Sequence, residues 1–112
     1  MIEVTDSSWK TLIYENSLPI IILYTVGKDL EPCITVEKYI DEILKTDFRV
    51  SGFTYDMLKN YRYKFEKHIS GTPTLIGIKN QKIILSAPRV MTKRMIKEFI
   101  DKLVSSKIEV IL

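Results

Sequence analysis

Five runs of apolar and β-branched residues along the chain predict β-strands. They are Ile2–Thr5, Ile20–Val26, Phe48–Thr54, Thr74–Lys79 and Lys82–Ala87. The second run is almost continuously apolar, which is typical of a central strand that is covered on both faces. Only Asn80 and Gln81 separate the last two runs, so these two strands should form a β-hairpin.

Between these runs, apolar residues recur three or four positions apart and predict four amphipathic helices. Their stripes are Trp9, Leu12 and Ile13; Val36, Ile40, Ile43 and Leu44; Leu58, Tyr61, Phe65 and Ile69; and Met95, Ile96, Phe99, Ile100 and Leu103. The second helix should begin around residues 30–32, with Asp29 as its N-cap, and the fourth around Thr92. The predicted order is βαβαβαββα, which indicates an α/β fold with a mixed central sheet and helices on both faces.

Length and composition limit the classes of protein to which the chain can belong. Its 112 residues, 46% of them hydrophobic, suit a single domain spanning residues 1–112. A net charge of +3 is too small to indicate nucleic-acid binding. The apolar run Leu18–Tyr24 is too short to span a membrane, and the N-terminus does not have the pattern of a signal peptide. Since Cys33 is the single cysteine, no disulfide can form within the chain, and the expected location is cytoplasmic.

Two short motifs lie at the starts of predicted elements. Pro32-Cys33 begins the second helix, and residues 71–74, Gly-Thr-Pro-Thr, open the fourth strand. With these motifs in register, the chain resembles the thioredoxin family over residues 2–105, and residues 105–112 form a C-terminal extension. The resemblance places Cys33 at the second cysteine of the family motif Cys-Gly-Pro-Cys. It also implies a thioredoxin-like fold with a cis peptide bond between Thr72 and Pro73.

Four positions at the implied active site depart from the family pattern. Leu30 stands where the attacking cysteine should be, so the motif reads Leu-Glu-Pro-Cys, and Asp29 replaces the preceding tryptophan. Tyr24 replaces the buried aspartate that assists proton transfer in the family, and Arg89 replaces a glycine beside the substrate groove. Because leucine cannot attack a disulfide, these changes indicate that the dithiol cycle has been lost.

The resemblance therefore implies a thioredoxin-like protein that binds a peptide or protein partner without catalysis. The degenerate motif and the cis-proline loop would supply the binding groove, formed by Leu30, Glu31, Pro32, Thr72 and Pro73. The alternative is a one-thiol redox protein in cell redox homeostasis, in which Cys33 forms mixed disulfides. A helix N-terminus lowers the pKa of the Cys33 thiol, whereas the charges of Asp29 and Glu31 raise it, so both functions stay open. Neither function requires a cofactor.

The remaining candidate residues have simpler structural explanations. His68, the single histidine, falls at the end of the third predicted helix, where a solvated side chain is more typical than a metal ligand. The same helix interleaves aromatic and basic residues, but Tyr61 belongs to its apolar stripe, and nucleic-acid binding is not expected. The apolar segment Ile108–Leu112 is expected to pack on the domain or to contact another subunit, which would produce an oligomer.

Overall fold

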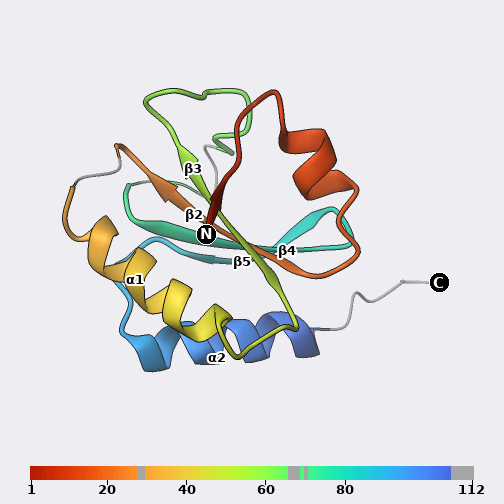
Figure 1. Ribbon diagram of the computed structural model, residues 1–112, viewed down its shortest axis with the longest axis vertical. Helices are drawn as coiled ribbons and strands as arrows, with labels where there is room; N and C mark the ends of the chain where they lie inside the picture. The colour runs from red at the N-terminus through yellow and green to blue at the C-terminus, as the bar shows by residue number, and fades with distance from the viewer. Residues whose placement is uncertain (28–29, 66–68, 70, 107–112) are drawn as a thin grey trace.

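The computed structural model describes residues 1–27, 30–65, 69 and 71–106. Its sheet is mixed and five-stranded, in the order β1-β3-β2-β4-β5 (Figure 1). The strands are β1 (Ile2–Glu3), β2 (Ile20–Thr25), β3 (Ser51–Asp56), β4 (Thr74–Lys79) and β5 (Lys82–Ala87). β1 and β2 each run parallel to β3, whereas β4 runs antiparallel to both β2 and β5. The chain therefore has the mixed α/β architecture that its hydrophobic pattern predicts.

Two α-helices, α1 (Cys33–Leu44) and α2 (Lys93–Ser105), pack against the same face of the sheet (Figure 1). Ile40 of α1 and Ile100 of α2 are fully buried in one cluster with Leu23 of β2. Burial of a side chain of this size stabilises the fold by about 1.5–3 kcal/mol. These helices confirm the second and fourth predicted stripes.

The opposite face of the sheet is covered by a short π-helical segment, η1 (Lys10–Tyr14), and by the irregular segment 57–65 (Figure 1). The Trp9 cluster, a buried group of apolar side chains around Trp9, fills this face. The Trp9 ring stacks on Tyr63 with 4.1 Å between centroids and meets the ring of Tyr55 edge-on at 5.6 Å. The prediction of helices on both faces is therefore confirmed only in part, because this face carries one five-residue helix and a loop.

The third predicted helix is wrong. It was expected to bury Leu58, Tyr61, Phe65 and Ile69 on one face, but the described residues between β3 and β4 form turns and irregular chain. Leu58 and Tyr61 are 72% and 74% exposed. Phe65 and Ile69 do pack against the Trp9 cluster, so half of the stripe is buried without a helix.

Side chains from elsewhere in the chain hold the backbone that would have formed this helix. The Asp6 carboxylate accepts hydrogen bonds from the backbone N–H groups of residues 61–62, at 3.1 and 3.3 Å. The Tyr55 hydroxyl accepts the N–H of Tyr63 at 3.1 Å, and the Tyr24 hydroxyl donates to the carbonyl oxygen of Tyr63 at 2.7 Å. Backbone groups that a helix would pair with one another are thus already satisfied by side chains.

β3 also begins later than predicted, because a turn precedes it. The carboxylate of Asp47 accepts the backbone N–H of Arg49 at 3.1 Å, a local bond that is typical of turns. Phe48, expected as the first residue of this strand, lies within the turn and is 77% exposed. The strand itself continues to Asp56, beyond its predicted end.

The ends of β4 and α2 are linked by one side chain. Asn80 and Gln81 connect β4 to β5 with positive φ angles of 51° and 65°, as a tight hairpin turn requires. Just before this turn, the ammonium group of Lys79 donates to the carbonyl oxygens of Val104 and Ser106, at 2.8 and 2.5 Å. Lys79 therefore satisfies carbonyl groups that the end of a helix leaves unpaired.

Candidate functional site

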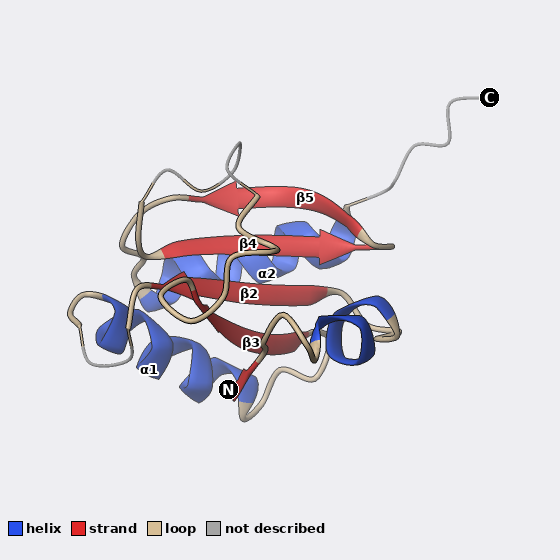
Figure 2. Ribbon diagram, turned by 90° about the horizontal axis from the view of Figure 1, so that it is seen from above, coloured by secondary structure: helices blue, strands red, loops and turns tan. Residues whose placement is uncertain are grey.

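The implied groove residues lie at the end of the sheet where β2 ends and β4 begins. Tyr24 and Thr74 are paired across the sheet, so the segment after β2 and the loop before β4 are neighbours. α1 begins at this end, opposite η1 and the β4–β5 turn (Figure 2). The Cys33 thiol interacts there with the side chain of Thr72 and the backbone of Val26. The fold thus brings the start of α1 against the loop that precedes β4.

The five residues of the implied groove differ in exposure. Leu30 is 53% exposed and Glu31 is also exposed, whereas Pro32 and Thr72 are half-buried and Pro73 is buried. The Thr72–Pro73 peptide bond is cis, as predicted, and the Glu31–Pro32 bond is cis as well. At the position that the resemblance assigns to an attacking cysteine, the chain therefore presents an apolar side chain to solvent.

Cys33, the first residue of α1, is only 4% exposed. Burial raises the pKa of its thiol, and the negative charges of Glu31 and Glu37 raise it further. Hydrogen bonds from the Thr72 side chain and the Val26 backbone lower the pKa, but they do not offset the burial. The thiol is therefore neutral at physiological pH and a poor nucleophile.

Glu31 stabilises the first turn of α1. Its carboxylate accepts a hydrogen bond from the Thr35 hydroxyl at 2.7 Å and from the Thr35 backbone N–H at 3.4 Å. The carbonyl oxygen of Leu30 accepts the N–H of Ile34 at 3.3 Å. These contacts fix the backbone that carries Leu30, and the Glu31 carboxylate pairs with an N–H group in the first turn of the helix.

Asp56 is a site residue that the sequence prediction missed. It is 4% exposed, and its carboxylate accepts the backbone N–H groups of Gly27 at 3.1 Å and Leu58 at 2.9 Å. Together with Cys33 it lines a cavity of about 130 Å³ between α1 and the ends of β2 and β3. An aspartate directly after an apolar run was the available signal, but the third strand was predicted to end at Thr54.

Tyr24 cannot take the proton-transfer role that the resemblance assigns to an aspartate at its position. It is fully buried in the Trp9 cluster, on the face of the sheet opposite α1, and its hydroxyl is bonded to Tyr63. Burial raises the pKa of the Tyr24 phenol far above its ordinary range, so it does not exchange a proton with Cys33. Arg89 is exposed and lines a surface cavity between β5 and α2.

The chain matches no family model, and no curated protein is significantly similar to it. The site is therefore interpreted from its own geometry. Among the described residues, no group of three or more His, Cys, Asp or Glu side chains is arranged to hold a metal ion. Within the same part of the chain, no helix has the length and apolarity needed to cross a membrane. Three predicted features, Asp29, His68 and the segment Ile108–Leu112, lie outside the described residues.

Proposed function

We propose that this chain is a thioredoxin-like protein that binds a peptide or protein partner and performs no dithiol exchange. The binding surface would combine the start of α1 with the loop before β4, through Leu30, Glu31, Pro32, Thr72 and Pro73. One observation carries the proposal: the exposed first position of the motif is Leu30, while the single thiol, Cys33, is buried. Such a surface offers apolar contact to a partner but no attacking sulfur.

The topology supports the thioredoxin-like part of the proposal. β2 is the central strand, between the parallel β3 and the antiparallel β4, and α1 is the next element after it. Cys33 begins that helix, as the resemblance implies. The irregular segment 57–65 departs from the resemblance, but it leaves the start of α1 and the loop before β4 as neighbours.

The burial of Cys33 weighs against the one-thiol alternative. A mixed disulfide forms when a thiol is both accessible and deprotonated. Cys33 is 4% exposed, and burial raises its pKa. The proposal keeps the cytoplasm as the compartment, because a single thiol stays reduced there.

Exposed apolar side chains around the site indicate the chemistry of the partner. Leu30 and Ile34, which are one helical turn apart, are 53% and 40% exposed. Leu58 is 72% exposed and lies beside Gly27, just after β2. A Cβ atom placed on Gly27 would be 3.5 Å from the Cδ1 atom of Leu58. A peptide with apolar side chains fits this surface, since its burial there would supply the binding free energy.

Selection of displayed peptides against the wild-type protein tests the proposal. Selected peptides should bind the Leu30→Asp variant at least about tenfold more weakly than the wild type. The reason is that desolvation of the new carboxylate against apolar side chains costs more than about 1 kcal/mol of binding free energy. Phe48→Asp is the matched control: Phe48 is 77% exposed and precedes β3, at the opposite end of the sheet. If Leu30→Asp binds the peptides as well as the wild type does, the proposed surface is wrong.

Alkylation of Cys33 tests the loss of redox chemistry separately. Near neutral pH, iodoacetamide should modify the native protein about tenfold or more slowly than the urea-unfolded chain, because burial and the raised pKa both suppress the thiolate. The native protein should also fail to catalyse insulin reduction. Rapid native alkylation together with insulin turnover would establish the one-thiol function instead.

A further inference from the structure

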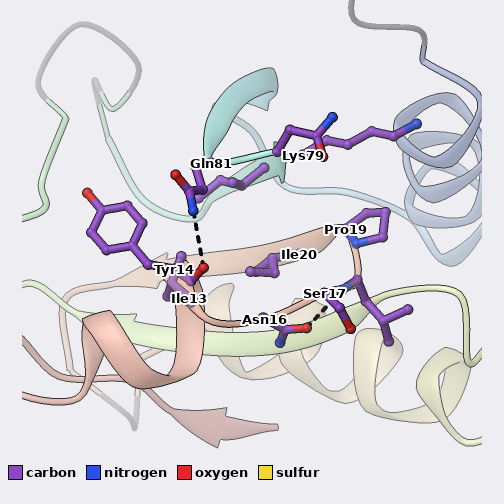
Figure 3. Close-up of a pocket in the computed structure, with 11 residues that line it drawn as sticks. Ile13, Tyr14, Asn16, Ser17, Pro19, Ile20, Lys79 and Gln81 are labelled. Carbon is purple, nitrogen blue, oxygen red and sulfur yellow. Dashed lines mark hydrogen bonds between the residues drawn. The ribbon is translucent and has the colours of Figure 1, made fainter.

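Two adjoining cavities lie at the end of the sheet opposite Cys33. η1 approaches the β4–β5 turn at this end (Figure 2), and Figure 3 shows the residues of one of the two cavities. Their volumes are about 350 and 310 Å³. Both cavities are lined by Ile13, Tyr14, Ile78 and Gln81. The two spaces therefore share a wall.

A hydrogen bond crosses from the turn to η1 in this wall. The side-chain amide of Gln81 donates to the carbonyl oxygen of Tyr14 at 3.3 Å (Figure 3). The bond is exposed to solvent, so its exchange for a bond to water or to a bound acceptor changes the free energy little. The Gln81 amide can therefore also serve a ligand that enters from this side.

The smaller of the two, here called the Trp9 cavity, has an aromatic wall. Trp9, Phe65 and Ile83 line it, and the rings of Trp9 and Phe65 have centroids 5.8 Å apart. Phe65 has a φ of 48°, a left-handed conformation that is rare for a bulky side chain. Non-glycine residues in such conformations concentrate at ligand-binding sites.

The charged side chains that line the two cavities are lysines. Lys79 lines the larger cavity and Lys82 the Trp9 cavity, and the described lining residues include no carboxylate. Lys79 donates to main-chain carbonyl oxygens, which leave its positive charge in place. Lys82 is exposed at the start of β5. Lys82 therefore places a positive charge at the rim of the Trp9 cavity.

We propose that the Trp9 cavity binds a medium-chain carboxylate. Its alkyl chain would lie against the accessible side chains of Phe65, Ile83 and Tyr14, over the buried Trp9 ring, and its carboxylate would remain at the rim beside Lys82. A volume of about 310 Å³ is near the lower limit of small-molecule sites and suits a chain of about ten carbon atoms. Apolar burial supplies the affinity, and the lysine selects an anionic head group.

Trp9 is the single tryptophan, so its fluorescence reports directly on this cavity. Titration with ω-bromodecanoate should quench Trp9 emission, because the bromine atom of a ligand in the cavity comes close to the buried indole ring. Decanoate should reverse the quenching by competition. Decanol should bind at least about fivefold more weakly than decanoate in this competition, and decylamine should not compete. Phenylpropionate in the same competition separates an aryl carboxylate from a fatty acid as the preferred ligand.

Two variants and their controls localise the site. Lys82→Glu should weaken ω-bromodecanoate binding by about three- to tenfold, whereas Lys45→Glu, at the exposed end of α1, should leave it unchanged. Ile83→Phe fills the cavity without changing its charge and should also weaken binding. Leu30→Asp, which alters the opposite end of the sheet, should not. Absence of quenching, equal competition by decanol and decylamine, or equal effects of the Lys82 and Lys45 variants would overturn the proposal.

Discussion

The two faces of the sheet are held by different kinds of interaction. On the face covered by α1 and α2, here called the helical face, both helices bury apolar stripes, and Ile40 and Ile100 are fully buried in one shared cluster. On the opposite face, here called the Trp9 face because the Trp9 cluster fills it, the segment 57–65 is held in place by hydrogen bonds to a few side chains, among them Asp6 and Tyr55. Both faces bury an apolar cluster, but directional bonds fix the backbone of a covering segment on the Trp9 face, whereas packed helices cover the helical face.

This difference predicts how damage spreads. Loss of an apolar contact in a packed layer lowers the stability of the whole sheet, because the cavity is shared by neighbouring elements. Loss of a polar side chain that pairs with several backbone groups releases one segment and leaves the rest of the fold intact. Four experiments test this difference between the two faces.

The largest effect is expected for Ile100→Ala in α2. Ile100 is fully buried, and removal of its side chain should lower the free energy of unfolding by about 2–5 kcal/mol. Urea unfolding monitored by circular dichroism should remain a single transition at a lower midpoint. A loss of amide protection confined to α2, with the sheet unaffected, would contradict the cooperative character assigned to this face.

Asp6→Ala should give the next largest effect. The carboxylate accepts bonds from the Tyr55 hydroxyl and from the backbone N–H groups of residues 61–62, so the variant leaves three donors without their partner. We expect a loss of about 1–3 kcal/mol, together with rapid amide exchange in residues 60–63. Asp101→Ala, which removes an exposed ion pair with Arg49, is the matched control and should change the unfolding free energy by about 0–1 kcal/mol. Retained protection in residues 60–63 of the Asp6 variant would refute the role of Asp6.

Tyr24→Phe removes one hydroxyl from the Trp9 face and nothing from the helical face. Because Tyr24 is fully buried and donates to the carbonyl oxygen of Tyr63, its loss should cost about 1 kcal/mol. Tyr61→Phe removes the same group from a side chain that is 74% exposed, and its unfolding free energy should match that of the wild type. Equal stabilities of the two variants would show that the Tyr24 bond does not stabilise segment 57–65.

The smallest effect concerns pH and again involves Asp6. Burial raises the pKa of this carboxyl, but hydrogen bonds from Tyr55 and from the backbone of residues 61–62 lower the pKa by more than burial raises it. The net shift of the pKa is therefore downward. A carboxyl with a lower pKa in the folded state stabilises the fold above its unfolded pKa, and this contribution is lost as pH falls through the folded pKa. The unfolding free energy should therefore decline below about pH 4. Asp6→Asn should flatten that decline; an unchanged acid dependence in this variant would assign it to other carboxyls.

The elements that depend on neighbouring residues could be predicted from the sequence. Asn80-Gln81 specifies the hairpin through its own backbone conformation, and Thr92 caps α2 by accepting the N–H of Met95, three residues away, at 3.2 Å. The third helix was wrong for the complementary reason. Leu58 and Tyr61 have helical spacing, but the groups that decide this segment's backbone lie far away in sequence, in Asp6 and Tyr24.

The candidate site shows the same division. The position of Cys33 at the start of a helix follows from the local pattern. Its hydrogen-bond partners do not, because only the folded sheet brings Thr72 and Val26 to the thiol. Asp56 was missed because one of its partners, the N–H group of Gly27, becomes a neighbour only when β2 and β3 pair, whereas the other, that of Leu58, is two residues away.

The bonds from Lys79 to the last turn of α2 have a mechanical consequence. A stretching force applied to the chain at Ser106 is carried by the Lys79 ammonium group into β4, rather than by the helix backbone alone. β4 is paired on both edges, with β2 and β5, so the load passes into two ladders of hydrogen bonds. Because Thr92 secures the first turn of α2 and Lys79 the last, the helix has no free end from which tension can unwind it.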